Sequence, residues 1–137
     1  MANTFTAPFA QTPKTNTAVT TTAGTYVDDA PTNSVLLVTA GADGALVTKI
    51  TAMPRATVTA TACNVFFSPD DGTTNRLVDN VLIAAHTVAA TTIIPVNTFS
   101  LVSETTPIRL QAGEKLYVNS SVTLAGGIVF NAEWTDF

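Results

Sequence analysis

The sequence predicts an all-β protein: an antiparallel β-sandwich of about eight strands, jelly-roll-like in its connections, with an extended N-terminal arm. Three observations support this. Thr supplies about a fifth of the chain and Val is frequent, whereas Lys and Glu, which dominate helix surfaces, are scarce. From residue 34 onward, short apolar runs alternate with turn residues. The last run, 128–135, alternates apolar and polar side chains, as a half-buried strand does.

The first segment along the chain is the predicted arm, residues 1–24, which we separate from a sandwich domain at 25–137. The arm is polar, and no helical or strand periodicity spans it. Its prolines favour extended backbone, and its phenylalanines are its large apolar anchors. A preformed extended segment loses less entropy when it binds a partner. The predicted partner-binding residues of the arm are Phe5, Pro8, Phe9 and Pro13.

Each predicted strand of the domain is a run of apolar or β-branched residues bounded by Gly, Pro, Asp or Asn. The first run is apolar throughout, which fits a strand covered on both faces, and Gly-Ala-Asp-Gly at 41–44 then predicts a hairpin. Pro-Asp-Asp-Gly at 69–72 predicts a tight turn in which Gly takes a positive φ. The predicted strands are 34–39, 45–53, 56–68, 76–84, 91–99, 108–110, 115–121 and 128–135.

Two of these strands carry irregularities. Within 56–68 the apolar phase changes near Cys63 and Asn64, which predicts a β-bulge or a change of partner strand. Within 91–99, Pro95 cannot donate a ladder hydrogen bond, so this strand is expected at a sheet edge or beside a bulge. An immunoglobulin-like sandwich is the nearest alternative, but a chain with a single cysteine lacks the Cys-Trp-Cys pattern of such domains.

Composition limits the partners. The formal charge is −4 and the basic residues are scattered, so we expect no nucleic-acid partner bound through its phosphates. No apolar run approaches the roughly 20 residues of a membrane span, and no secretory signal is recognisable, so we expect no membrane partner and synthesis in the cytoplasm. Charged residues are only 12% of the chain. A surface so poor in charge is typical of one that neighbouring subunits cover.

Residues that carry catalytic or metal-binding chemistry are few and isolated. His86 is the only histidine, and no nucleophile motif such as Gly-x-Ser-x-Gly accompanies it. The pairs Asp28-Asp29 and Asp70-Asp71 lie in turns, where Asp is favoured for its local hydrogen bonds. The second pair also lacks the spaced ligands of a calcium loop. We therefore predict a protein that is not an enzyme, with no catalytic residue, cofactor or metal site.

A carbohydrate site remains an alternative, because jelly rolls also serve as lectins. The aromatic residues do not cluster in the sequence, however. Trp134 shares a strand face with Ile128 and Phe130, which favours a place in the core or at a subunit interface over a sugar-stacking platform.

Cys63 is expected to be a small core residue of a strand.

Three segments give the chain a resemblance to a known family. They are TAMPRATVTAT at residues 51–61, PIRLQAGEKLYV at 107–118 and AGGIVFNAE at 125–133. Together with the style of the domain from about residue 33 onward, which is rich in Ala, Thr and Val, they resemble small β-sandwich virion proteins of tailed bacteriophages. The resemblance implies a particle component without catalytic residues, most plausibly a capsid decoration protein. Such proteins often bind as trimers over the junctions between capsomers.

The sequence therefore leads to one functional expectation and several rivals. We expect a phage virion structural protein, made in the host cytoplasm and located on the capsid surface, that binds the major capsid protein and stabilises the head. We also expect it to form a homo-oligomer, as a trimer. The rivals are another virion component (tail, baseplate or head-fibre protein), a sugar-binding β-sandwich module and, least favoured, a small hydrolase.

Overall fold

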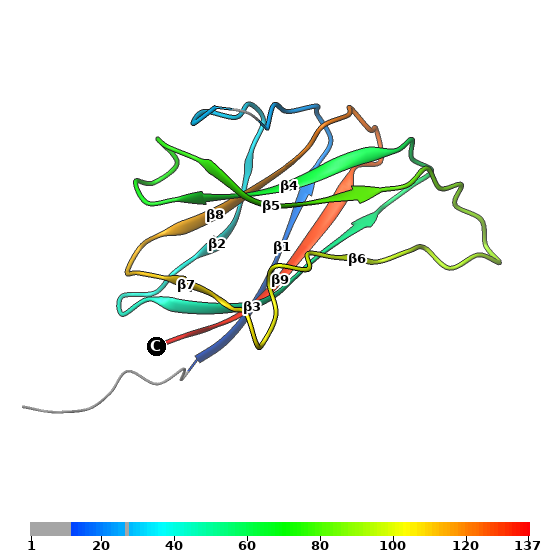
Figure 1. Cartoon of the computed structure of the whole chain (residues 1–137). Coiled ribbons are helices and arrows are strands. Elements are labelled where there is room, and N and C mark those ends of the chain that lie inside the picture. The colour runs from blue at the N-terminus through cyan, green and yellow to red at the C-terminus, as the bar shows by residue number, and fades with distance from the viewer. Residues whose placement is uncertain (1–11, 27) are drawn as a thin grey trace, which may run out of the picture.

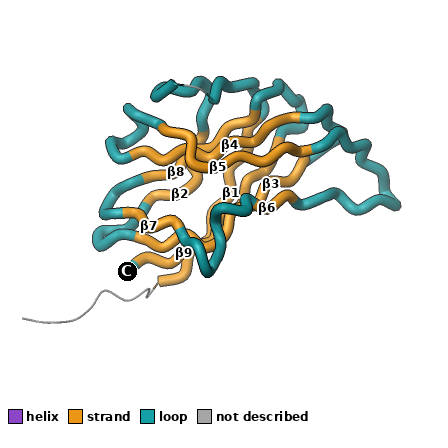
Figure 2. Tube along the Cα trace, in the orientation of Figure 1, coloured by secondary structure: helices purple, strands orange, loops and turns teal. Residues whose placement is uncertain are grey.

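The computed structural model describes residues 12–26 and 28–137, which form two antiparallel sheets packed against each other (Figure 1). Every regular element in this part of the chain is a strand, and loops join the strands (Figure 2). The predicted all-β antiparallel sandwich is confirmed. The strands are β1 (Thr12–Thr20), β2 (Val35–Thr39), β3 (Ala45–Pro54), β4 (Thr61–Ser68), β5 (Arg76–Ile83), β6 (Asn97–Thr98), β7 (Ile108–Leu110), β8 (Lys115–Ser120) and β9 (Ile128–Asp136).

The strand order interleaves the chain between the two sheets. Sheet A has the order β1-β9-β3-β6, with β7 pairing to β3 as well, and sheet B has the order β2-β8-β4-β5. The strands β1 to β4 therefore lie in sheets A, B, A and B in turn, and the first strand pairs with the last. This connectivity favours the jelly-roll form of the sandwich.

The core lies between the sheets, and β9 builds much of one wall. Ile128, Phe130, Ala132 and Trp134 are at most 7% exposed, which confirms the alternation predicted for this strand. Phe99, directly after β6, stacks on Phe130 with ring centroids 6.2 Å apart. Burying a large apolar side chain of this kind stabilises a fold by roughly 1.5–3 kcal/mol.

The main difference from the sequence prediction is β1. Residues 12–20 were expected to belong to a separate arm, but they form the edge strand of sheet A, paired with β9 along all 9 residues. Pro13 lies within this strand, at a sheet edge, where a residue without an amide proton is tolerated. The first residues of the expected arm, 1–11, lie outside the described part of the chain.

Sequence patterning missed β1 because its inward side is largely polar. Lys14 Nζ lies 2.6 Å from Asp136 Oδ2, and Asn16 Nδ2 donates to Leu37 O on β2 at 2.9 Å. Only Ala18 and Thr20 of β1 are buried, and neither is strongly apolar. A strand held by an ion pair and an amide leaves no period-2 hydrophobic signal.

Two further predicted strands are shorter than expected. The long run 56–68 is a strand only from residue 61, and its register shift falls between Val65 and Phe66, slightly beyond the predicted bulge. Of the run 91–99, only residues 97–98 pair, as β6, on the edge of sheet A. Pro95 therefore precedes the strand rather than interrupting it.

The outer face of sheet B is covered by the connection between β1 and β2. We call residues 25–26 and 28–33 the cover segment. Asn119 Nδ2 on β8 donates to Thr25 O at 2.7 Å, and Asn75 N donates to Asp29 O at 2.7 Å. On the same outer face Phe66 is 0% exposed, although it lies outside the main core cluster. Sheet B thus buries side chains on both faces.

The outer face of sheet A is open by comparison. Thr15, Glu133 and Lys49 lie side by side across β1, β9 and β3. Lys49 Nζ is 3.8 Å from Glu133 Oε2, with about half of each side chain exposed. The next row along is Thr17, Asn131 and Thr51, so this part of the face is polar.

Candidate interaction surfaces

The sandwich has two lateral edges with different surfaces. β1 and β2 end the two sheets on one side, and β6 and β5 end them on the other. Asn16 links β1 to β2. At the opposite edge, Asp79 of β5 is 7% exposed, and its Oδ2 accepts a hydrogen bond from Leu101 N at 3.1 Å. Each side of the sandwich is therefore closed by a polar contact between the sheets.

The connection between β5 and β6, which we call the 84–96 loop, projects from the second of these edges (Figure 1). It contains no Asp, Glu, Lys or Arg. Ile93 is 91% exposed and Val96 is 53% exposed. A loop that shows aliphatic side chains to solvent without any charge is typical of a protein contact surface.

The first part of the loop is hydrogen-bonded mainly to residues 57 and 58. His86 and Val58 exchange backbone hydrogen bonds of 3.0 and 2.9 Å. Val88 N donates to Thr57 Oγ1 at 3.1 Å, and Thr92 N donates to Ala89 O at 3.2 Å. These bonds hold the part of the loop from His86 to Thr92, which lowers the entropy that this part would lose on association.

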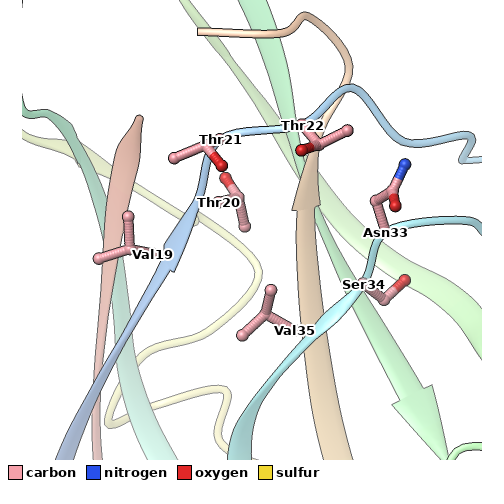
Figure 3. A pocket seen from close by; sticks show the side chains of 7 residues that line it. All are labelled: Val19, Thr20, Thr21, Thr22, Asn33, Ser34 and Val35. Atoms are coloured by element: carbon pink, nitrogen blue, oxygen red, sulfur yellow. The ribbon is translucent and has the colours of Figure 1, made fainter. Parts of the chain in front are cut away.

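A groove of about 200 Å³ opens at the other edge, between the end of β1 and the start of β2 (Figure 3). Val35 of β2 points into the gap between the two strands, and Val19 of β1 is 37% exposed. None of the lining residues is charged. The groove, which we call the edge groove, is lined by Val19, Thr20, Thr21, Thr22, Asn33, Ser34 and Val35.

Much of the polar lining of the edge groove is already paired within the chain. Thr20 Oγ1 donates to Ser120 Oγ at 3.0 Å, and Asn33 Nδ2 donates to Ala23 O at 2.7 Å. Ser34 Oγ donates to Pro31 O at 3.4 Å. With these donors used internally, the groove still shows somewhat more polar than apolar surface.

A second groove of about 300 Å³ lies beside the open face of sheet A. Its lining includes Lys49, Glu133 and Glu104, so it is charged where the edge groove is not. Neither groove is predicted from the sequence. No local signal could have revealed them, because each is built from segments that are distant in the chain.

The predicted partner-binding residues are not brought together by the described structure. Pro13 is exposed in β1, whereas Phe5, Pro8 and Phe9 lie outside the described residues. Trp134 is 7% exposed on the inner face of β9, as expected for a core residue. Its Nε1 donates to Asp136 Oδ1 at 3.2 Å.

The isolated reactive residues have local structural roles. Cys63 is fully buried, and burial raises the pKa of its thiol to about 12. The backbone amide of Thr74 holds the pKa of the Asp70 carboxyl below its usual value. This agrees with the prediction that Asp70 makes local hydrogen bonds in a turn. Asp71 forms an ion pair with Lys115 and raises the pKa of that amine. His86 contributes its backbone to the pairing with Val58.

Burial and hydrogen bonding act in opposite directions on Asp136. Burial raises the pKa of its carboxyl, but hydrogen bonds from Lys14 and from Gly41 N outweigh burial and hold the pKa below its usual value. Asp136 is 6% exposed, so the charged carboxylate is retained inside by these donors. This cluster joins the first strand, the last strand and the hairpin at 41–44.

Comparisons with models of known protein families, with curated proteins and with solved structures gave no match to the chain. Across residues 12–26 and 28–137, no three His, Cys, Asp or Glu side chains are grouped so that they could hold a metal ion. The described part of the chain also has no helix long and apolar enough to cross a membrane.

Proposed function

We propose that this chain is a phage virion structural protein that decorates the outside of the capsid, binding the major capsid protein and stabilising the head. The observation that carries the proposal is the 84–96 loop: a preformed, uncharged loop with Ile93 91% exposed. A surface of this kind acts through contact with protein. The resemblance of three sequence segments to small virion β-sandwich proteins is the reason for proposing a phage particle as the partner.

Attachment to the shell is assigned to the first residues of the chain. These residues directly precede β1, which begins at Thr12, paired with Asp136. Phe5, Pro8 and Phe9 act as anchors on the capsid. Weak contacts repeated over a symmetric lattice add up through effective concentration. Binding that favours the assembled shell over its free subunits stabilises it.

The test compares virions made with the gene, without it, and with a variant lacking residues 2–11. Deletion stops at residue 11 because a longer one would remove β1 from sheet A. Electron microscopy of heads carrying the chain should show added density on the outer lattice, and these heads should resist heating better than bare heads. The shortened variant should fold but leave the lattice bare. Density on the tail alone, or none on the virion, would overturn the proposal.

A sugar-binding module is the second candidate, favoured by the hydroxyl and amide groups that line the edge groove. The groove has no aromatic side chain on which a sugar ring could stack. Binding of the purified chain to a glycan array, lost on replacing Asn33 by Ala, would support this candidate over capsid decoration.

A further inference from the structure

We propose that residues 12–17, the first part of β1, form a strap that opens away from β9 and closes again while the rest of the sandwich stays folded. The last part of β1, from Ala18 to Thr20, stays in place as the fixed end of this strap. The inference goes beyond the proposed function, because it concerns the chain on its own and needs no capsid.

Burial changes abruptly along β1. All residues of the strap are exposed, whereas Ala18 is 6% exposed and Thr20 is 2% exposed. The strap therefore gains little from the hydrophobic effect, and it lies at the edge of sheet A with β9 as its one partner in the sheet. Segments with few buried apolar contacts open at a lower free energy than the whole fold.

The chain beyond the strap is anchored by contacts that do not involve β9. Thr20 Oγ1 donates to Ser120 Oγ at 3.0 Å, and Leu124 N donates to Thr21 O at 2.9 Å. Gly24 N donates to Ser120 O at 2.8 Å. These bonds remain when the strap leaves β9, so the opening stops before the buried end of β1.

Two side-chain contacts act as a latch on the closed strap. Lys14 Nζ lies 2.6 Å from Asp136 Oδ2 on β9, and Asn16 Nδ2 donates to Leu37 O on β2 at 2.9 Å. The Lys14 side chain is about half exposed, so water and salt compete for its ammonium group. The latch therefore holds the strap by polar contacts that solvent can replace.

The opened state leaves the buried carboxylate of Asp136 with partners. Gly41 N and Trp134 Nε1 each donate to its Oδ1 at 3.2 Å, and neither donor belongs to β1. A buried charge that kept no donor would make opening very costly. Because these two donors stay, the loss is confined to the Lys14 ion pair.

Opening changes which strand ends sheet A. Residues 131–136 of β9 lose the strap as their neighbour, but the same residues stay paired with β3. The remaining strands of the sheet can therefore keep their order. An uncovered strand edge is a template for pairing with another extended chain. The strap and its latch thus control access to the edge of β9.

The experiment is native-state hydrogen exchange of the purified full chain, followed by NMR at increasing urea below the unfolding transition. Amides of the strap should exchange through an opening that depends only weakly on urea, because little surface is exposed. Amides of β3 should exchange only through global unfolding. Within β9, amides that donate to the strap should follow the strap, and those that donate to β3 should follow β3. One common urea dependence for all of these amides would overturn the inference.

Two substitutions separate the strap from the rest of the fold. Phe66→Leu removes packing on sheet B, which the opened state retains, so it should speed exchange in β3 by about tenfold and leave the strap amides unchanged. Lys14→Met breaks the latch in every open state, so it should speed exchange of both groups by about tenfold. Faster exchange of the strap in Phe66→Leu, by the same factor as β3, would show that the strap opens only with the whole fold.

Lys49→Met is the matched control for the latch. Lys49 also pairs with a β9 carboxylate, that of Glu133, but at 3.8 Å and with both side chains about half exposed. The variant should leave exchange of the strap and of β3 within about twofold of the wild type. An effect on the strap equal to that of Lys14→Met would contradict the assignment of the latch.

A reversible disulfide tests whether the strap itself moves. Thr15→Cys and Glu133→Cys, combined in one chain, place two thiols at paired positions of the strap and β9, at a separation that a disulfide spans. Oxidation should slow exchange of the strap amides by about tenfold or more relative to the same chain after reduction. Cys63 does not interfere, because it is buried and its thiol has a pKa of about 12. Equal exchange in the oxidised and reduced chains would overturn the inference.

Discussion

The outer faces of sheets A and B show how one fold can treat two similar surfaces differently. Sheet B carries the cover segment, which is bonded to Asn119, and Phe66 on the same outer face is 0% exposed. Sheet A carries Thr15, Lys49 and Glu133 in solvent. The difference teaches that the outer face of sheet B contributes to stability, because the cover segment forms a third layer over the two sheets. The residues on the outer face of sheet A contribute little and can be substituted at small cost.

The largest expected effect is that of Phe66→Ala, which tests whether the cover segment builds a second core. Removing this fully buried ring should lower the free energy of unfolding by about 3–5 kcal/mol, measured by urea denaturation. Thr15→Ala on the open face is the control and should change it by about 0.5 kcal/mol or less. Equal effects of the two substitutions would show that sheet B is as open as sheet A.

Asn119→Ala is expected to have the next largest effect. Its side-chain amide donates to Thr25 O and Thr32 O, and its Oδ1 accepts from Asn64 Nδ2 at 2.9 Å. Loss of these bonds leaves buried groups unpaired and should cost about 2–3 kcal/mol. Hydrogen exchange should report the cause, since the Asn75 amide, bonded to the cover segment, should exchange faster.

Asn131→Ala is the matched control for that substitution. Asn131 lies in the row across the outer face of sheet A, and its Oδ1 is buried without a hydrogen-bond partner among the described residues, so its removal breaks no bond of that oxygen. The variant should lose well under half as much stability as Asn119→Ala, and its exchange pattern at Asn75 should match the wild type. A larger loss of stability for Asn131→Ala than for Asn119→Ala would show that the outer face of sheet A contributes more to stability than that of sheet B.

Lys14→Met tests the ion pair that joins β1 to the rest of sheet A. At pH 7 it should cost about 1–2 kcal/mol, because the buried Asp136 carboxylate loses its cation. The folded-state pKa of Asp136 lies below the unfolded value of about 3.9. The pair therefore stabilises the fold above that value, and its contribution is lost as the pH falls through the folded-state pKa. Urea midpoints of the two chains should converge in acid; a constant difference would contradict the assignment.

The smallest effect is expected for Lys49→Met on the open face. Lys49 and Glu133 are 3.8 Å apart, and each side chain is about half exposed. Solvent and salt screen such a pair, so the loss should be about 0–0.5 kcal/mol and should vanish at high salt. A loss as large as that of Lys14→Met would show that the outer face of sheet A is not open to solvent.

The difference between strands buried on one face and strands buried on two explains which strands the sequence pattern predicts correctly. β9 alternates because only one of its faces is buried, and its pattern indicated the strand correctly. β4 is buried on nearly every residue, since the cover segment adds a second buried face. The change of apolar phase near Cys63 was interpreted as a bulge, and a register shift does follow at Val65, but two-sided burial is the larger cause.

The interaction surfaces were harder to predict. β1 was missed because Lys14 and Asn16 occupy its inward side, where a hydrophobic pattern would normally appear. The β-branched residues of the run 91–99 predict a strand, but most of the run lies in the 84–96 loop. High β-propensity alone does not make a strand, because strand pairing depends on packing against neighbours. The edge groove joins residues 19–22 to 33–35 and has no local signature.

The pairing of β1 with β9 has a consequence for how the protein is made. The two strands come from opposite ends of the chain, yet they are neighbours in sheet A. During synthesis on the ribosome, Thr12–Thr20 emerges early and must wait for the final residues before it can take its place. Such long-range pairing slows folding and leaves an unpaired strand exposed meanwhile. Loss of a few C-terminal residues would therefore remove the partner of the earliest strand as well.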